Sequence, residues 1–339
     1  MNSEQTTENQ QGLRVLSLYD GMSCGLIALL TSGVPVERYV AYENDPYAIQ
    51  TSSHNFAFIE HMGDIMGADF LPYVGFDLLV GGSPCTYWSV TKRSGREVEA
   101  SGLGWELFLK YVEALVEVKP RFFIYENNKS MARAIRETIT DVFGFEPICI
   151  NSSLVSAQNR ERLYWVGRLM PDGTYQKVDI VLPEDRNVKV HDVINCRQDS
   201  CCTYPLNVTE GGKAFAIKAN YFKSSLANFT NGGGHYPQTG VLEQIAPLSL
   251  PDHAQQTNSN SVFRVENGML NVNGRILDIA TPDGYYIIRK LTVLECKRLQ
   301  TIPDWYEFPV SDTRAYKMIG NGWTVAVISH IVQSLRLVY

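Results

Sequence analysis

The segment Leu13–Gly33, LRVLSLYDGMSCGLIALLTSG, combines a strand pattern, a tight turn and a helix pattern. The apolar run Leu13–Tyr19 is typical of a buried strand, and Cys24–Thr31 is typical of a short helix. Between them, Gly21 and Gly25 allow the backbone to approach a ligand closely, and the helix N-terminus offers free N–H groups. The spacing differs from the Gly-x-Gly-x-x-Gly pattern of dinucleotide sites. We therefore predict the first strand, ligand loop and helix of an α/β sheet.

The same alternation continues through the first half of the chain, with helical stretches of about 10–15 residues between strand-like runs. The further predicted strands are Val40–Glu43, Phe76–Val80, Arg121–Tyr125 and Tyr164–Gly167. The further predicted helices are Pro46–Phe56, Leu107–Val118, Met131–Val142 and, near the C-terminus, Thr324–Leu337. This order predicts a doubly wound α/β sheet.

The composition changes after about Arg168. Residues 171–285 are rich in Asn, Ser, Thr, Gly and Gln, with short strand-like pieces and a strong breaker at Asn231–Gly234. Residues 186–235 carry a net charge of +3. A basic ligand-binding face and ordinary solvated loop charge explain this excess equally well. We predict a smaller, loop-rich domain here.

Composition sets broad limits. The 339 residues are 45% hydrophobic and 19% charged, which suits one large domain with an insertion or two domains. The net charge of −6 argues against attachment to nucleic acid by bulk charge alone. No apolar run approaches the roughly 20 residues of a membrane span, and the polar residues 1–12 resemble a disordered tail without a secretion signal.

The seven cysteines are an odd number, and without a secretion signal we expect reduced thiols in the cytoplasm. Cys196, Cys201 and Cys202 are crowded together, with His191 upstream. They form no Cys-x-x-Cys pair, so ordinary loop cysteines are favoured over a zinc site. We predict no metal.

Two carboxylates follow the strands next to the ligand loop. Glu43 ends the second predicted strand, where an acidic side chain commonly holds ribose hydroxyls. Asp64 follows a third strand and could accept a hydrogen bond from an adenine amino group. Each alone is more commonly a surface residue. Together they indicate a cofactor that contains adenosine but no pyrophosphate.

Possible catalytic groups follow the later strands. Cys85, in GGSPC (81–85), lies at the carboxyl end of a strand, where nucleophiles are placed in such sheets; a buried structural Cys is the alternative. Glu126 brings a carboxyl group to the same edge. The alternate spacing of Arg160 and Arg162 aims both at one face, and a salt-bridged edge strand is the alternative there.

In order, these segments resemble the DNA cytosine-5 methyltransferase family of bacterial and phage type. The resemblance rests on LSLYDGMSCG (16–25), Glu43, Asp64, GGSPC (81–85) with Ser89 four residues later, ENN (126–128), QNRER (158–162), RKLTVLECKRLQTIPDWY (289–306) and IGNGWTV (319–325). Eight motifs in the family's order are highly specific. They leave out about 170–288, where the family keeps its variable target-recognition region.

The resemblance implies an α/β fold: a Rossmann-like S-adenosylmethionine-dependent methyltransferase sheet, with a smaller, loop-rich target-recognition domain inserted before the C-terminal helix. We expect a disordered tail over residues 1–12. The catalytic domain would comprise 13–169 and 314–339, and the target-recognition domain 170–313. Residues 171–285 would then set the choice of DNA sequence.

The resemblance also implies the site residues. The catalytic residues would be Cys85, Glu126, Arg160 and Arg162. The cofactor-binding residues would be Tyr19, Asp20, Gly21, Ser23, Cys24, Gly25, Glu43, Asn44, Asp64, Ile65, Pro84, Leu107, Asn321 and Trp323. The segment Thr86–Leu103 resembles the family's mobile catalytic loop, with Gly95, Gly102 and Gly104 as candidate hinges. DNA phosphates would be contacted by Ser89, Lys92, Arg93 and Arg96.

The implied reaction explains these residue types. Carbon 5 of cytosine is a poor nucleophile, so the Cys85 thiolate adds to C6 while Glu126 bonds N3 and the exocyclic amine. C5 then takes the methyl group of S-adenosylmethionine, leaving S-adenosylhomocysteine, before a base removes the C5 proton and Cys85 is eliminated. Arg160 and Arg162 are implied to hold O2 of the base and to organise Cys85. The target base must be flipped out of the duplex.

The chain departs from the family pattern at four places. Asn127 stands where Val is usual, and Thr86 stands where Gln is usual. The cofactor loop has Tyr-Asp-Gly-Met-Ser for Phe-Ala-Gly-x-Gly, and the C-terminal motif has Gly-Asn-Gly-Trp for Gly-Asn-Ser. These changes affect the fine shape of the cofactor pocket more than the reaction.

Two other functions fit the sequence less well than DNA cytosine-5 methylation. A tRNA cytosine-5 methyltransferase is disfavoured by the long recognition region and by the absence of the tRNA-acting signature around Cys85. A catalytically inactive regulatory homologue is disfavoured by the intact catalytic residues. We expect a monomer that acts on double-stranded DNA in the cytoplasm of a bacterial or phage-infected cell, associated with the nucleoid and independent of membrane and metal. The target sequence and the presence of a companion restriction endonuclease stay open.

Overall fold

The computed structural model describes residues 12–90, 94–194, 202–230, 237–245, 262–279 and 281–337, so the predicted tail lies almost entirely outside the described residues. The chain divides into two compact units. Unit 1 comprises Met1–Asn151, Glu161–Pro183 and Trp323–Tyr339. Unit 2 comprises Ser152–Arg160 and Glu184–Gly322.

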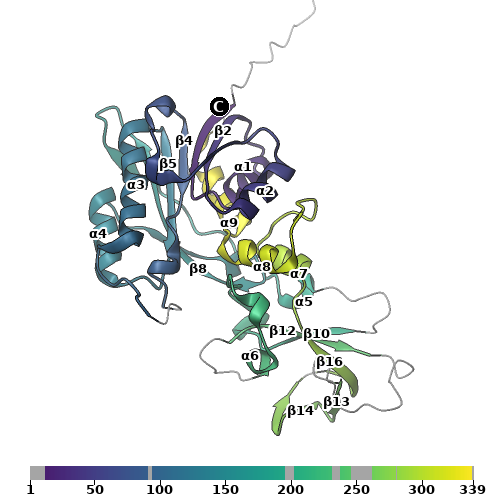
Figure 1. The fold of residues 1–339 in the computed structure, drawn as a ribbon. Helices are drawn as coiled ribbons and strands as arrows, with labels where there is room; N and C mark the ends of the chain where they lie inside the picture. The colour runs from purple at the N-terminus through teal and green to yellow at the C-terminus, as the bar shows by residue number, and fades with distance from the viewer. Residues whose placement is uncertain are drawn as a thin grey trace, which may run out of the picture. The chain divides into compact units, whose positions relative to one another are not determined.

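Unit 1 is built on one mixed sheet in the order β3-β2-β1-β4-β5-β8-β6, with β9 beside β8 (Figure 1). Its strands are β1 (Leu13–Leu18), β2 (Val36–Tyr42), β3 (Glu60–Gly63), β4 (Leu78–Gly81), β5 (Phe122–Asn128), β6 (Ile148–Asn151), β8 (Glu161–Leu169) and β9 (Tyr175–Lys177). The first five strands run parallel, and β8 pairs antiparallel with both β5 and β6. Every residue of β4 and β5 is buried, as expected for central strands covered on both faces.

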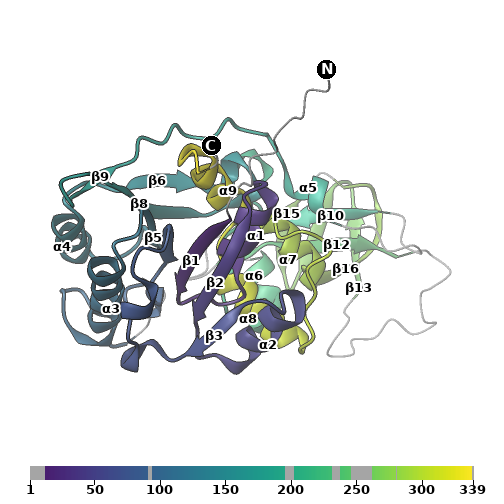
Figure 2. The same ribbon diagram turned by 90° about the horizontal axis from the view of Figure 1, so that it is seen from above.

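Helices cover both faces of this sheet. They are α1 (Cys24–Thr31), α2 (Pro46–Asn55), α3 (Gly102–Val118), α4 (Arg133–Phe143) and α9 (Val325–Ser334). Figures 1 and 2 show α3 and α4 on one face, with α1 and α9 on the other. Helix α4 buries Ile135, Ile139 and Phe143, which follow one another at intervals of four residues on one side of the helix. It ends at Gly144 in the left-handed conformation.

Unit 2 contains an antiparallel sheet in the order β10-β12-β16-β13-β14-β15 and a parallel pair, β11-β7. Its strands are β7 (Gln158–Asn159), β10 (Thr203–Leu206), β11 (Ala214–Phe215), β12 (Gly240–Gln244), β13 (Val262–Glu266), β14 (Met269–Val272), β15 (Arg275–Asp278) and β16 (Gly284–Lys290). Its helices are α5 (Val190–Val193), α6 (Leu226–Thr230), α7 (Val293–Leu299) and α8 (Asp312–Asn321). Arg289 on β16 bonds Glu243 of β12 and Glu295 of α7, which joins this sheet to the helix.

The structure confirms the predicted Rossmann-like α/β class, and α1 has the predicted bounds. Strands β3, β6 and β9 were not assigned bounds from the sequence. The short strand-like pieces of residues 171–285 form a regular antiparallel sheet. Helix α3 begins at Gly102, so the last residues of the predicted loop Thr86–Leu103 are helical. Of the helices within the described ranges, none is long and apolar enough to cross a membrane.

Close packing of β5 against β8 gives a test of the core. Gly167 on β8 pairs with Phe123 on β5, and a methyl group on Gly167 would lie 2.2 Å from Cε1 of the fully buried Phe123 ring. We expect Gly167→Ala to lower the free energy of unfolding by about 1–3 kcal/mol, measured by urea denaturation. Gly67→Ala is the matched control, because a methyl group at Gly67 meets no atom within 4 Å. Equal stabilities of the two variants would contradict this packing.

Candidate active site

Most predicted site residues of unit 1 follow the carboxyl ends of the parallel strands β1, β2, β3 and β4, and Glu126 lies in the last half of β5. In open α/β sheets, ligands bind at this edge. The turn after β1 has left-handed backbone at Tyr19, Gly21 and Ser23, with φ values of 60°, 58° and 62°. The Ser23 side chain hydrogen-bonds Asp20 and Ser52 and does not cap the first turn of α1. Side-chain hydrogen bonds within the turn and to α2 therefore hold its backbone conformation.

Asp20 is the centre of this turn. Its carboxylate accepts hydrogen bonds from Ser17 Oγ at 2.6 Å and from the Tyr39 hydroxyl at 2.7 Å, in addition to Ser23. Burial raises the pKa of Asp20, and these hydroxyl donors oppose the rise. Asp20 thus holds the loop together from within.

Glu43 ties the same loop to the end of β2. Its Oε2 accepts the Gly21 N–H at 2.8 Å, and its Oε1 accepts the N–H groups of Asn44 and Asp45 at 2.9 and 2.8 Å. Burial raises the pKa of Glu43, while the backbone donors lower it. A carboxylate has about four acceptor positions, so Oε2 retains one for a further donor such as a ribose hydroxyl. Asn44 itself is exposed.

Three other predicted cofactor residues lie on nearby elements of unit 1. Asp64 is exposed, and its Oδ1 accepts the Met66 N–H at 3.0 Å to cap a 3₁₀ turn. Ile65 is buried in the core of the unit. The Tyr19 hydroxyl donates to the Leu107 carbonyl at 2.5 Å, which brings α3 to the ligand loop. Burial raises the pKa of Tyr19, so its hydroxyl stays protonated as a donor.

Cys85 begins a 3₁₀ turn directly after Pro84, and this half-buried cysteine is in no disulfide. The loop before it lies along the end of β5, because Gly81 pairs with Tyr125 in the sheet. A methyl group on Gly82 would lie 2.6 Å from the Glu126 carbonyl oxygen and 3.0 Å from its Oε2. The loop that leads to Cys85 therefore packs directly against Glu126 and its carboxylate.

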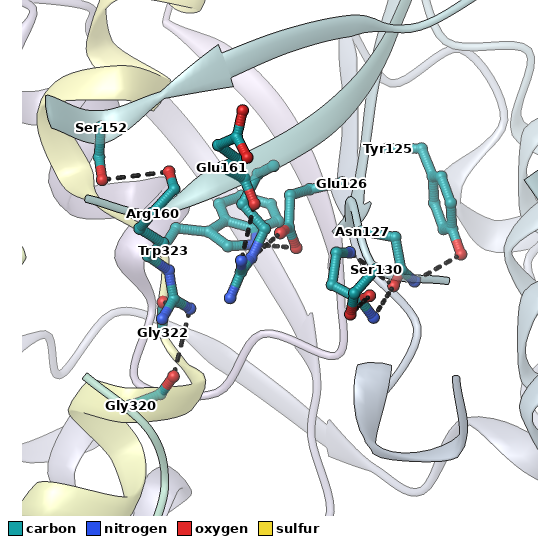
Figure 3. A network of polar contacts seen from close by, with 12 residues as sticks. Tyr125, Glu126, Asn127, Ser130, Ser152, Arg160, Glu161, Gly320, Gly322 and Trp323 are labelled. Carbon is teal, nitrogen blue, oxygen red and sulfur yellow. Dashed lines mark hydrogen bonds and ion pairs between the residues drawn. The ribbon is translucent and has the colours of Figure 1, made fainter. Parts of the chain in front are cut away.

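Asn127, which replaces the usual Val, fastens this loop to β5. Its Nδ2 donates to the Tyr125 hydroxyl at 3.2 Å (Figure 3). The same Nδ2 donates to the Ser83 carbonyl at 3.1 Å, and Oδ1 accepts the Asn128 N–H at 2.8 Å. The hydroxyls of Ser83 and Tyr125 are 2.7 Å apart. Both ends of the buried amide are satisfied, so the departure from the family pattern has a structural role.

Glu126 meets two donors from distant parts of the sequence. Its Oε1 lies 3.0 Å from Arg162 Nε, and its Oε2 accepts the Trp323 indole N–H at 2.9 Å (Figure 3). Glu126 is only 9% exposed. The structure thus brings together two predicted catalytic residues and one predicted cofactor residue, and no sequence motif indicates the Trp323–Glu126 bond.

Arg160 has a different role. Strand β7 ends at Asn159 and β8 begins at Glu161, so Arg160 lies between two strands while Arg162 lies within β8. Arg160 is buried in unit 2, where it donates to the backbone carbonyls of Ile217, Gly320 and Gly322 at 3.0, 3.2 and 3.0 Å. Asn321, also in unit 2, is exposed at the end of α8.

Glu97 joins Trp88 to Gly104 through two hydrogen bonds in the segment after Cys85. We call these three residues the clasp. The fully buried Trp88 donates its indole N–H to Glu97 Oε2 at 3.0 Å, and Gly104 in the first turn of α3 donates to Glu97 Oε1 at 3.2 Å. Gly104 is buried within this clasp, which does not suit the predicted hinge role. Sequence reasoning missed Glu97, which no motif marks.

The predicted phosphate contacts lie in the same segment. Arg96 donates to the carbonyls of Trp88 and Ser130 at 3.0 and 2.7 Å, so its guanidinium binds backbone here. The Ser89 N–H donates to the Cys85 carbonyl at 2.9 Å. Lys92 and Arg93 lie outside the described residues.

The crowded cysteines are only partly described: Cys202 is half-buried, and Cys196 and Cys201 lie outside the described residues. In the part of the chain that the structure describes, no group of three or more His, Cys, Asp or Glu side chains could hold a metal ion.

Comparison of sequences relates the chain to known methyltransferases. Residues 13–336 match the family described as C-5 cytosine-specific DNA methylase. The chain is 36% identical to the orphan methyltransferase M.SPRI of Bacillus phage SPR, over 96% of this chain and 98% of the relative. It is 25% identical to the type II methyltransferase M1.ScrFI of Lactococcus lactis subsp. cremoris, over 88% of this chain and 72% of the relative.

Solved structures share the fold. The S. pombe Dnmt2 methyltransferase superimposes with a TM-score of 0.59 at 16% identity, over 95% of this chain and 97% of that chain. The Entamoeba histolytica methyltransferase EhMeth gives 0.63 at 12% identity, over 96% and 98%. At these identities the likeness concerns the fold alone.

The clasp predicts how the segment after Cys85 resists proteolysis. Glu97→Ala removes the acceptor of both the Trp88 indole and the Gly104 N–H, so the segment should open more often. We expect roughly tenfold faster tryptic cleavage after Arg96, measured by mass spectrometry of timed digests, because cleavage follows the open population. Glu99→Ala, which removes an exposed carboxylate from the same segment, is the control. Equal cleavage rates for both variants would count against the clasp.

Proposed function

The chain belongs to the family of C-5 cytosine-specific DNA methylases, and from this membership we propose that Cys85 attacks carbon 6 of a cytosine flipped out of a DNA duplex. As a member of this family, the protein is a DNA (cytosine-5) methyltransferase. The observation that carries the proposal is the geometry of Glu126, whose carboxylate contacts the loop to Cys85 and has one donor on each oxygen.

This geometry suits cytosine recognition. Arg162 and Trp323 use one acceptor position on each oxygen of Glu126, so about one position per oxygen is left. Cytosine presents the acceptor N3 beside its exocyclic amine, which is a donor. With Glu126 protonated, one oxygen would donate its O–H to N3 and the other would accept from the amine. Uracil presents a carbonyl oxygen where cytosine has the amine, so the same carboxylate would repel it.

The same arrangement supports addition of the thiolate. We propose that Glu126 is protonated when cytosine binds, and that N3 takes this proton as the sulfur of Cys85 bonds to C6, so the negative charge passes from sulfur to the carboxylate. Arg162 and Trp323 stabilise that carboxylate with hydrogen bonds already in place, which needs no rearrangement during the reaction. The enamine-like ring then carries its nucleophilic character at C5.

The cofactor of the family is S-adenosylmethionine, and the residues of unit 1 fit it. Bound S-adenosylmethionine supplies a methyl group on a positively charged sulfur. We propose that Oε2 of Glu43 accepts a ribose hydroxyl at its remaining position, and that Asp64 and Ile65 receive the adenine. The other proposed cofactor contacts are Tyr19, Asp20, Gly21, Ser23, Cys24, Gly25, Asn44, Pro84, Leu107, Asn321 and Trp323. Since Asp20 is engaged within its turn, we propose that it acts by shaping the loop.

Arg160 is proposed as a positioning residue. It donates a hydrogen bond to the carbonyl of Gly322, the residue covalently joined to Trp323.

For contact with DNA, we propose that Ser89, Lys92, Arg93 and Arg96 meet phosphates, which requires Arg96 to release its two carbonyl partners. We propose that residues 171–285, within the target-recognition domain 170–313, choose the sequence in double-stranded DNA. The relatives from phages and bacteria support action inside a bacterial or phage-infected cell.

Glu43 tests the cofactor assignment. We expect Glu43→Ala to weaken S-adenosylmethionine binding roughly 10–150-fold, because a hydrogen bond to a charged group is lost. Isothermal titration calorimetry measures this affinity, and DNA affinity should be nearly unchanged. Glu37→Ala is the control, because it removes an exposed carboxylate from β2, the strand that Glu43 follows. Unaltered cofactor affinity in Glu43→Ala would remove Glu43 from the site.

Cys85 tests the reaction itself. With 5-fluorocytosine replacing cytosine in DNA of mixed sequence, addition and methyl transfer can proceed, but no C5 proton is left to remove. The protein should stay covalently attached to DNA through denaturing electrophoresis, and only when S-adenosylmethionine is present. Cys85→Ser should abolish the adduct, because a neutral hydroxyl is far less nucleophilic than a thiolate.

Cys149→Ser is the matched control for the trapping experiment, since Cys149 is also a half-buried free thiol. This variant should still trap DNA. An adduct that persists in Cys85→Ser, or that peptide mapping assigns to another cysteine, would overturn the proposed nucleophile.

A further inference from the structure

Trp323 touches both the catalytic carboxylate and the ligand loop. Its indole N–H donates to Glu126 Oε2 at 2.9 Å (Figure 3). On another side of the ring, a methyl group built on Gly25 would lie 3.6 Å from Trp323 Cζ3. All three residues belong to unit 1. One side chain therefore links the first turn of α1 to the end of β5.

The second donor fixes the orientation of the carboxylate. The terminal torsion of a Glu side chain is broad, so a bond to one oxygen leaves the carboxylate plane free to turn. Arg162 reaches Oε1 through Nε, while its Nη1 donates to the Glu161 carbonyl at 2.8 Å. The Trp323 bond to the other oxygen holds the plane from a second direction. The two open acceptor positions of Glu126 are then fixed in space.

The chemistry of the donor also suits its place. An indole N–H is uncharged, so it stabilises a carboxylate without adding a second cation beside the ligand loop. The indole nitrogen lies three bonds from Cβ, so the N–H reaches farther from the backbone than the hydroxyl of a serine, which lies one bond from Cβ. The reach to Glu126 is thus a property of the tryptophan.

We propose that Trp323 is a positioning residue for methyl transfer: its N–H orients the Glu126 carboxylate toward the cytosine and stabilises the charge that this carboxylate gains when N3 is protonated. This inference rests on the proposed function. It assigns Trp323 a role in the rate of the reaction, separate from its proposed contact with the cofactor.

Trp323→Phe tests this role, because phenylalanine keeps an aromatic ring at this position and removes the N–H donor. The assay is single-turnover transfer from saturating tritiated S-adenosylmethionine to unmethylated DNA of mixed sequence. We expect the rate to fall roughly 10–100-fold, while cofactor affinity measured by calorimetry changes less than about threefold. Trp305→Phe, at an exposed tryptophan, should keep the wild-type rate. An unchanged rate in Trp323→Phe, or a loss explained by cofactor affinity, would overturn the inference.

A double-mutant cycle shows whether Trp323 acts through Glu126. Adding Trp323→Phe to Glu126→Gln should slow the residual reaction by less than about twofold, because the carboxylate is already gone. A full additional loss in that background would show that Trp323 acts elsewhere and would overturn the inference. Wild-type protein that transfers no methyl group to cytosine would instead overturn the proposed function, and the inference with it.

Discussion

Burial of the Glu126 carboxylate is the constraint on which the site depends. A charged group removed from water costs several kcal/mol unless it is paired and hydrogen-bonded. The pairing here comes from Arg162 on β8 and from Trp323 before α9, so three segments far apart in sequence must meet at one side chain. The antiparallel pairing of β8 with β5 serves this need directly, because Glu126 and Arg162 lie near the same end of that ladder.

Near this carboxylate, side chains of neighbouring segments hold the backbone in place. Asn127 holds the loop before Cys85, and Arg96 and Glu97 hold the segment after it. Cys85 therefore lies between two segments that are both held by hydrogen bonds. The first is tied by a buried amide within the sheet, whereas the second depends on partly exposed contacts that are easier to break. This difference suits a static base for the site and a cover that opens for DNA.

The sequence predicted much of unit 1 because its strands are continuous apolar runs that end in polar or glycine-rich turns. Cys85, Glu43 and Glu126 could be singled out because each follows or ends such a run. The six-stranded sheet of unit 2 was not predicted, since its strands mix polar and apolar residues and are only four to seven residues long. The backbone contacts of Arg160 were not predicted, because nothing in QNRER shows that the strand is interrupted at that residue. The direction of the Trp323 ring depends on tertiary packing, which no local pattern encodes.

Glycine stands at the first two positions of GGSPC because a larger side chain would not fit there, and not because the backbone conformation requires glycine. Neither Gly81 nor Gly82 has the left-handed backbone that favours glycine. A methyl group on Gly81 would lie 2.7 Å from the Leu18 carbonyl oxygen, and one on Gly82 would meet the backbone of Glu126. Such contacts with backbone cannot be relieved by rotating a side chain. The two glycines thus let β4 and the loop that leads to Cys85 lie directly against β1, which precedes the ligand loop, and β5, which carries Glu126.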